Sequence, residues 1–406
     1  MPILEGALAV ALVVWCALGI FHLWNARGLT ALGPGMAGDL PVPAALEAPA
    51  SASAPRVSII VAARNEQEML PATLASLAGL DYPDYEVILV DDDSTDRTGA
   101  IADQWAASPE SAGRRRVIHN HALPAGWRGK VHALDLAARA ATGDWLLSTD
   151  ADVVFHPDAL RLAMAVALGD GAQLFSMMPE FEYGSFGEKA ILPAFSFLLA
   201  TLFPVRLVNN PRSRRAIAAG AFILMRRADF DELGGYSSLR GTLIEDLRTA
   251  QMFKQSGRHI RAAVSRGLLR TRMYASLREL WEGLRRSAFE GSGRSVPKVL
   301  AGLAGGNLLG VLPWAAAASL LAADLEARRA LASDRALLLA MAACVVSVLV
   351  YLPFLVFLRV PPLYVLALPL ATLCYSGIAL DSMVSSRFGG GVTWKDRTYT
   401  APDDGR

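Results

Sequence analysis

Apolar residues in this chain of 406 residues gather toward its two ends, and a mixed pattern fills the middle. Nearly unbroken apolar runs cover residues 3–24, 299–323, 336–358 and 361–380. Each run is close to the length of about 20 residues that a membrane-spanning helix needs. The run at 191–207 is shorter and contains two prolines, so we expect a buried or interfacial helix there. The pattern predicts one N-terminal and about three C-terminal transmembrane helices around a central domain.

The middle of the chain alternates between short β-branched apolar runs and segments with helical spacing. We expect strands within residues 56–66, 85–90, 116–119 and 143–152, and helices at 68–79, 96–107 and 131–141. Such alternation implies a mostly parallel sheet with right-handed crossovers, in which ligands bind at the carboxyl ends of the strands. The predicted fold class is therefore α/β.

Changes of composition predict the domain boundaries. Residues 28–55 are rich in Ala, Pro and Gly without periodicity, which indicates a flexible linker. We expect an anchor at 1–27, this linker, a globular domain at 56–298, a membrane region at 299–380 and a polar tail at 381–406. Within the globular domain, segments at about 190–208 and 274–298 are expected to lie at the membrane interface.

Composition and charge support a membrane protein. The chain is 53% hydrophobic and 19% charged with a net charge of +1, which is more apolar than an ordinary soluble protein. Glu5 stands before the first apolar run and Arg27 after it, which favours a retained anchor over a cleaved signal peptide. Arg27 and the many basic residues between 258 and 298 place the central domain on the cytoplasmic side of the inner membrane. All three cysteines lie in apolar segments, which fits a reducing compartment.

Acidic and other polar side chains follow three of the predicted strands. Adjacent carboxylates repel one another and need a cation or a hydrogen-bonding ligand. A divalent cation, Mg²⁺ or Mn²⁺, that arrives with a nucleoside diphosphate is the simplest partner, because magnesium typically uses one or two carboxylates plus phosphate oxygens. His119 and His121 are expected to be ordinary surface histidines. The residues at the strand ends are Arg64, Asn65, Glu66, Asp91, Asp92, Asp93, Asp150 and Asp152.

Four segments in sequence order resemble the family 2 glycosyltransferases, whose nucleotide-binding domain has the GT-A fold. They are VSIIVAARNE, VILVDDDSTD, STDAD and GTLIEDLRTAQMFKQSG, and the resemblance covers about residues 56–261. The segment GWRGKVHAL and the arrangement of apolar runs resemble membrane-bound members that glycosylate lipids. Residues 203–227 further resemble the hopanoid-associated subgroup.

Two features depart from the family pattern, and the other matching residues each have an implied role. Asp93 stands where a Gly is common, and the segment WEGLRRSAF at 281–289 replaces a Gln-x-x-Arg-Trp element, which argues against a processive polymer synthase. The implied roles are nucleoside contacts for Ala62, Arg64 and Glu66, base recognition for Asp92 or Asp91, ribose and metal contacts for Asp150 and Asp152, donor-phosphate contacts for Lys130, general base for Asp246 and its orienting partner for Glu245. In place of the missing element, we expect Arg285 or Arg286 to contact the diphosphate.

The implied activity is an inverting hexosyl transfer from a nucleotide sugar, with a UDP-sugar favoured, to the hydroxyl of a membrane lipid such as a hopanoid, carotenoid or glycerolipid. No nucleic-acid partner is expected. Transfer to polyprenyl phosphate is an alternative in which the acceptor is already an anion. A receiver-like signalling domain and a non-catalytic scaffold are further alternatives. The sugar, the acceptor and the oligomeric state do not follow from the sequence.

Overall fold

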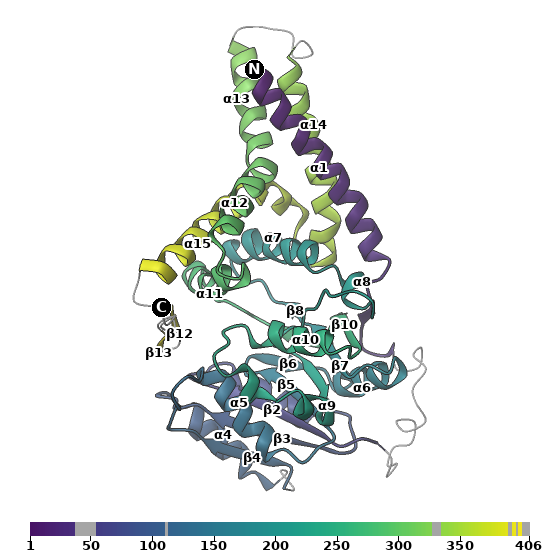
Figure 1. Cartoon of the computed structure of the whole chain (residues 1–406), viewed down its shortest axis with the longest axis vertical. Helices are drawn as coiled ribbons and strands as arrows, with labels where there is room; N and C mark the ends of the chain where they lie inside the picture. Colours follow the sequence, from purple (N-terminus) through teal and green to yellow (C-terminus); the bar gives the residue numbers. More distant parts are fainter. Residues whose placement is uncertain (37–53, 110–112, 327–333, 389–391, 395–396, 400–406) are drawn as a thin grey trace. The chain divides into compact units, whose positions relative to one another are not determined.

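The computed structural model describes residues 1–36, 54–109, 113–326, 334–388, 392–394 and 397–399. These residues form two compact units (Figure 1). The first, called the sheet unit, consists of Gly28–Glu182 and Phe203–Met273. The second, called the helical unit, consists of Met1–Arg27, Tyr183–Leu202 and Tyr274–Arg406. The chain therefore leaves the sheet unit at Tyr183, returns at Phe203 and leaves it again at Tyr274.

The sheet unit is built on an eight-stranded sheet in the order β1-β10-β7-β9-β5-β2-β3-β4. Neighbouring strands are parallel, except that β9 runs antiparallel to both β5 and β7. A separate sheet has the order β6-β11-β8. The strands of the two sheets are β1 Ala31–Leu32, β2 Val57–Ala63, β3 Tyr85–Asp91, β4 Arg115–His119, β5 Trp145–Asp150, β6 Val153–Phe155, β7 Leu174–Met178, β8 Glu180–Phe181, β9 Ile223–Arg226, β10 Ile260–Ser265 and β11 Leu269–Thr271.

Buried apolar side chains on both faces hold the central strands in place. Ile59 and Val61 of β2 pack into one core cluster, whereas Ile60 packs into another. This division follows from the alternation of side chains along a strand and explains why β2 and β3 are continuous apolar runs. The helices of the sheet unit are α3 Leu70–Ala78, α4 Thr98–Ala106, α5 Gly129–Ala140, α6 Ala159–Gly169, α8 Val205–Val208, α9 Arg227–Glu232, the 3-10 helix η3 Tyr236–Leu239 and α10 Glu245–Gln255.

The strands and helices expected between residues 56 and 152 are present, with ends shifted by a few residues. The structure differs from the prediction at the start of the expected linker. Ala31 and Leu32 form β1, which pairs in parallel with β10, and Leu32 is fully buried. Long-range pairing therefore orders a segment whose local composition indicates a linker. Residues 37–53 of that linker lie outside the described residues.

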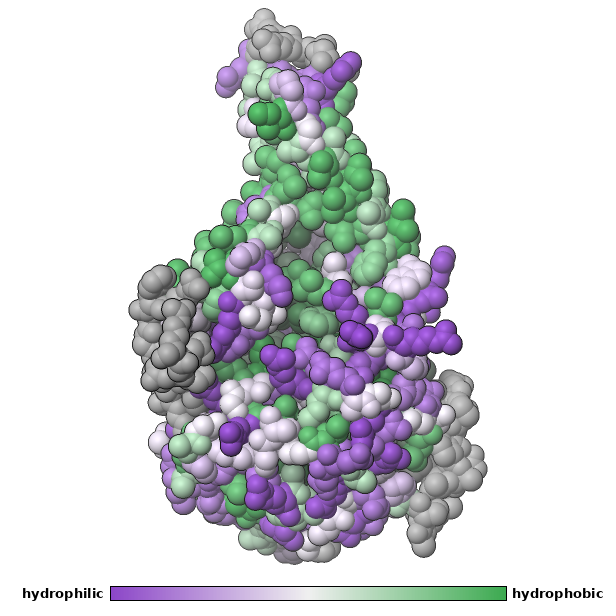
Figure 2. Space-filling view, in the orientation of Figure 1, coloured by the Kyte–Doolittle hydropathy of each residue, from purple (hydrophilic) through white to green (hydrophobic). Residues whose placement is uncertain are grey.

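The helical unit contains the expected apolar helices. Among the residues that the structure describes, three helices are long and apolar enough to span a membrane, or four if the bent pair α12 and α13 counts as one span. Figure 2 shows apolar surface over α13 and α14. The helices of this unit are α1 Pro2–Ala26, α7 Phe186–Leu202, α11 Leu277–Gly291, α12 Val296–Gly310, α13 Leu312–Glu326, α14 Arg335–Phe357, the 3-10 helix η5 Pro362–Ala367 and α15 Leu368–Phe388.

The segments that we expected at the membrane interface within the globular domain belong mostly to the helical unit, which contains residues 190–202 and 274–298 but not 203–208. Ile191 of α7 packs in one cluster with Leu280 and Leu284 of α11 and Ile378 of α15. The predicted domain boundary at residue 298 thus differs from the structure, in which the sheet unit ends at Met273. The apolar faces of α7 and α11 explain the difference, because they pack against other apolar helices.

Candidate active site

Strand register brings the predicted polar residues to one edge of the sheet. In β2, Ala62 pairs with Asp150 of β5, and Ala63 pairs with Asp91 of β3. Ala62 is half-buried and packs against the core. The carboxyl ends of β2, β3 and β5 therefore lie side by side, as the rule for parallel sheets predicts.

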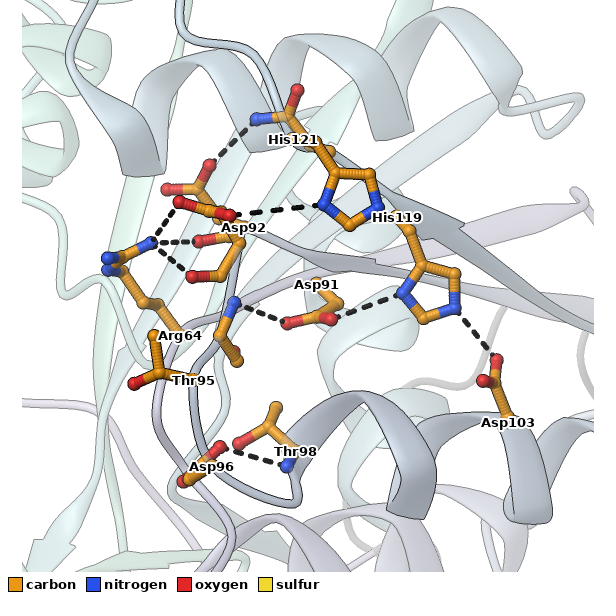
Figure 3. Close-up of polar contacts among 12 residues, drawn as sticks. Arg64, Asp91, Asp92, Thr95, Asp96, Thr98, Asp103, His119 and His121 are labelled. Carbon is orange, nitrogen blue, oxygen red and sulfur yellow. Dashed lines mark hydrogen bonds and ion pairs between the residues drawn. The ribbon is translucent and has the colours of Figure 1, made fainter.

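Asp91 is used within the fold. Its carboxylate contacts Nδ1 of His119 at 3.1 Å and accepts a hydrogen bond from the Ser94 amide at 3.3 Å (Figure 3). The other ring nitrogen of His119 lies 2.9 Å from Asp103. The Asp103 and Asp91 carboxylates raise the pKa of His119 above its usual value, although burial opposes them. His119 is thus not the ordinary surface histidine that we expected, because it joins the end of β3 to α4.

Arg64 holds the backbone of the turn that carries the aspartates and pairs with the last of them. Its guanidinium donates to the carbonyl oxygens of Asp92 and Asp93 at 2.5 and 2.6 Å and lies 3.4 Å from the Asp93 carboxylate (Figure 3). The φ angle of Asp93 is 58°, in the left-handed region that glycine adopts most readily and that aspartate tolerates. Asp93 therefore takes the backbone conformation expected of the glycine that it replaces.

Asn120 and Asp93 are candidate site residues that the sequence analysis did not assign. The Asn120 amide donates to Oδ1 of Asp92 at 2.7 Å and lies 3.3 Å from Nδ1 of His132. Asn120 directly follows β4, so the same search for polar residues after strands could have found it. Asp92 is only 1% exposed, whereas the Asp93 side chain is 48% exposed. Of the three aspartates, Asp93 is the one most open to a ligand.

A second cluster joins four residues of the predicted site across the sheet unit. Nζ of Lys130, at the start of α5, lies 2.7 Å from the Asp150 carboxylate and also forms an ion pair with Glu245, at the start of α10. Gly220 donates its backbone N–H to Asp246 at 3.2 Å. A Cβ atom at Gly220 would lie 3.1 Å from Oδ2 of Asp150, so a side chain there would crowd the cluster. Gly220 is a further residue that sequence reasoning missed.

Burial and neighbouring charge tune the acids and the base of this cluster. Burial and the neighbouring Glu245 carboxylate raise the pKa of Asp246 to about 7, and Lys130 opposes this rise. For Lys130, burial alone would lower the pKa, but Asp150 and Glu245 hold it well above its usual value. Asp246 therefore combines partial burial with a pKa suited to accepting a proton near neutral pH.

The remaining predicted residues lie elsewhere in the structure. The Glu66 amide donates to Thr98 at 2.7 Å, which ties the end of β2 to α4. Arg285 and Arg286 lie on α11 of the helical unit, where the Arg285 guanidinium is 3.6 Å from Asp381 and 3.4 Å from Ser385. Their expected contact with the diphosphate stays a prediction.

The carboxylates fit a cation that is shared with a ligand. Among the described residues, no group of three or more His, Cys, Asp or Glu could hold a metal ion. Asp150 ends β5 and Asp152 follows it, half-buried, just before β6. Two carboxylates plus phosphate oxygens form the set of ligands that Mg²⁺ commonly uses with nucleotides. These residues therefore suit a cation that binds together with a diphosphate.

Residues 58–234 match the family model described as glycosyl transferase family 2. The matched segment, less than half of the chain, is therefore similar to the glycosyl transferases of family 2. It contains the ends of β2, β3 and β5 and also Lys130 and Gly220. The chain is 32% identical over 158 residues to a β-monoglucosyldiacylglycerol synthase of Nostoc sp., covering 38% of this chain and 32% of that protein. It therefore spans about a third of the length of that relative.

Two further proteins are similar over more of their length. The chain is 26% identical over 249 residues to a 4,4'-diaponeurosporenoate glycosyltransferase of Staphylococcus haemolyticus, covering 60% of this chain and 64% of that protein. A mannosyltransferase from Pyrobaculum calidifontis, solved in complex with GDP-Man and Mn²⁺, superposes with a TM-score of 0.53 at 24% identity. That superposition covers 91% of this chain and 99% of that one.

These similarities confirm the fold expected from the sequence, a GT-A α/β domain with a mostly parallel sheet. The receiver-like alternative is wrong. A receiver has the five-stranded, flavodoxin-like order, whereas this sheet has eight strands and contains the antiparallel β9.

Proposed function

We propose that the protein is a membrane-bound, inverting glycosyltransferase that moves a hexosyl group from a nucleoside diphosphate sugar to the hydroxyl of a membrane lipid. The cluster of Lys130, Asp150, Glu245 and Asp246 is the observation that carries the proposal, because it joins a candidate donor site to a candidate base. One relative is named for a glycerolipid and another for a carotenoid, which supports a lipid acceptor. The resemblance of residues 203–227 makes a hopanoid a further candidate.

The donor is proposed to bind along the ends of β2, β3 and β5. Ala62, Arg64 and Glu66 would border the nucleoside, and Asp92, oriented by Asn120, would recognise the base. We favour a UDP-sugar. Asp150 and Asp152 would hold a divalent cation together with the diphosphate, and that cation would supply a Lewis acid for the charge of the leaving group. When Asp150 binds the cation, Lys130 would lose this partner and could contact the donor phosphates instead.

The acceptor is proposed to react on the side of α10. A lipid hydroxyl is a weak nucleophile until a carboxylate takes its proton in the transition state. Asp246 has a pKa of about 7, so it is substantially ionised at neutral pH and still basic enough to accept that proton. The N–H of Gly220 holds its carboxylate, and Lys130 fixes the neighbouring Glu245. Attack in line with the leaving diphosphate inverts the anomeric carbon.

The proposed location is the cytoplasmic membrane, with several spans and with the catalytic domain facing the cytoplasm. The helices that could span a membrane support the membrane location. The basic residues after α1 and around α11 support the orientation of the catalytic domain. Nucleotide sugars in the cytoplasm would then reach the donor site directly.

A transfer assay on the detergent-solubilised full chain tests the proposal. Wild type, Asp246→Asn and the control Asp231→Asn receive Mg²⁺ or Mn²⁺, labelled nucleotide sugars and a bacterial lipid extract, and label in the organic phase is counted. Asp231 is exposed and forms an ion pair with Arg227 of the same helix, α9, so its variant should keep wild-type activity. Loss of the general base should lower the rate about 10²–10⁴-fold in Asp246→Asn. Equal label from all three proteins would contradict a hydroxyl acceptor and favour polyprenyl phosphate.

A further inference from the structure

We infer that residues 206–215 of the sheet unit, called the basic loop, bind the headgroups of anionic phospholipids. The loop carries four exposed arginines, Arg206, Arg212, Arg214 and Arg215. The sequence contains no Asp or Glu between residues 203 and 228, so the loop has no acidic neighbour along the chain. Figure 2 shows hydrophilic surface at the position that α8, the first part of the loop, occupies in Figure 1.

Hydrogen bonds from the body of the sheet unit fix the shape of the basic loop. The ammonium group of Lys254, buried in α10, donates to the carbonyl oxygens of Val208 and Asn210 at 2.7 and 2.8 Å. The Asn209 side chain donates to the carbonyl of Ala262 in β10 at 3.0 Å and accepts from its N–H at 2.7 Å. The arginines therefore project from a backbone that is already ordered, which reduces the entropy lost on binding.

The chain itself keeps the basic loop close to the ends of α1, a candidate membrane helix, and of α7. The side chain of Arg206 packs against Gly28 so closely that a Cβ atom at Gly28 would lie 2.8 Å from it. Gly28 is the second residue after Ala26, where α1 ends, and two residues of extended chain reach at most about 7 Å. On the other side, α7 ends at Leu202, four residues before Arg206. The distance of at most about 7 Å from the end of α1 to Gly28 is shorter than the Debye length of about 8 Å at physiological salt.

Anionic phospholipid is the partner that this surface fits. Guanidinium groups bind phosphate oxygens through two parallel hydrogen bonds, and their charge is permanent. Each basic residue near an anionic membrane surface strengthens the attraction by roughly fivefold. The diphosphate of the nucleotide sugar is the alternative phosphate ligand that these arginines could bind. The basic loop lies beside β10, toward the β1 edge of the sheet, whereas β4 forms the opposite edge. Arginines on β4 therefore provide a matched control.

Hydrogen exchange on the full chain in lipid nanodiscs tests the inference without using transfer activity. Nanodiscs of phosphatidylcholine alone are compared with nanodiscs that contain roughly 30% phosphatidylglycerol. We expect peptides within 203–215 to exchange at least about threefold more slowly with phosphatidylglycerol present, and this protection to disappear in roughly 0.5 M salt. The double variant Arg212→Gln/Arg214→Gln should lose the protection. Arg114→Gln/Arg116→Gln, beside β4, should keep it.

Three outcomes would overturn the inference. Exchange of the loop could be the same in both lipids, or the protection could survive in Arg212→Gln/Arg214→Gln. A nucleotide sugar could also protect the loop in phosphatidylcholine alone while phosphatidylglycerol has no effect, which would assign the arginines to the donor. Unchanged exchange of β5 and β7 peptides in every variant shows that the fold is intact. Because no step measures transfer, failure of this inference and failure of the proposed function remain distinct results.

Discussion

At the residue scale, Lys130 connects the two halves of the candidate site. It contacts Asp150 at the end of β5 and Glu245 at the start of α10, and its charge opposes the rise in the pKa of Asp246. Asp150, Glu245 and Asp246 could be predicted from sequence because each belongs to a motif beside a strand or helix end. Asn120, which directly follows β4, could have been found by the same search, whereas Gly220 could not, because its role depends on a contact with Asp246 in a distant segment.

Replacing Lys130 should change the pH dependence of transfer. In wild type, the rate should fall about tenfold per pH unit below pH 7, because protonated Asp246 cannot act as a base. Lys130→Met removes the positive charge that lowers the pKa of Asp246, so the acid limb should move to higher pH. Lys130→Arg keeps that charge and should keep the limb near its wild-type position. Profiles of kcat/KM against pH for the three proteins check this, and an unmoved limb in Lys130→Met would refute the coupling.

His119 should stabilise the sheet unit in a pH-dependent way. Its pKa is raised in the folded protein by Asp103 and Asp91. A raised histidine pKa gives stability that is fully present below the unfolded value of about 6.5 and is lost as pH rises through the folded value. His119→Gln should therefore lower the apparent Tm more at pH 6 than at pH 9. His121→Gln, whose ring is exposed, serves as the control. An equal loss at both pH values in His119→Gln would contradict the assignment.

At the element scale, the central strands follow from sequence and the edge strand does not. The apolar runs of β2, β3 and β5 are long enough to show their burial without any knowledge of their neighbours. β1 has only two residues, and it exists because β10 offers a partner more than 200 positions later. β9 is equally difficult to place, since its antiparallel pairing between β5 and β7 depends on the return of the chain from α7.

Truncating Leu32 should loosen the edge of the sheet that β1 covers. Leu32 is fully buried, and a Leu→Ala change at such a site costs about 2–5 kcal/mol. We expect Leu32→Ala to lower the free energy of local opening of β10 amides, measured by hydrogen exchange at Ile260–Ser265, while β4 amides change less. Met273→Ala, at an exposed position of the same unit, should leave β10 unchanged. Unaltered β10 exchange in Leu32→Ala would show that β1 does not protect this edge.

At the scale of the whole molecule, packing within the helical unit indicates how the chain crosses the membrane. Leu8 of α1 packs with Ala316 of α13 and with Ala336 and Ala340 of α14, so the first turns of α1 and of α14 share one end of the unit. At the other end, Phe197 of α7 packs with the later part of α14. The sheet unit precedes and follows α7 in the chain, so we expect α7 to start and end on one side of the membrane.

The helix α15 lies beside elements from that same end. Its Ile378 packs with α7 and α11, and its Asp381 accepts a hydrogen bond from Trp281 of α11 at 2.8 Å. Although α15 together with η5 is long and apolar enough to span, these contacts along its length favour a course at the interface. The chain would then cross through α1, through α12 with α13, and through α14.

This arrangement predicts that the C-terminus and the sheet unit are on the same side of the membrane. Single cysteines are placed at Pro2, at Ser256 or after Arg406 in a chain whose own three cysteines are replaced by alanine. A membrane-impermeant maleimide applied to intact cells and to inverted vesicles should label the second and third positions under the same condition, and Pro2→Cys under the opposite one. Labelling of the C-terminal cysteine together with Pro2→Cys would instead make α15 a full span.

The path of the chain through α7 also affects how fragments of this protein can be expressed. Tyr183–Leu202 lies between two halves of the sheet unit, yet its apolar side chains pack against helices that lie far along the chain. Removing both ends of the chain would therefore leave α7 without its partners and expose an apolar helix in the middle of the fragment. A water-soluble version requires a short polar connection from Glu182 to Phe203 in place of that helix. Segments of the sheet unit and of the helical unit alternate along the chain, so no single truncation separates one unit from the other.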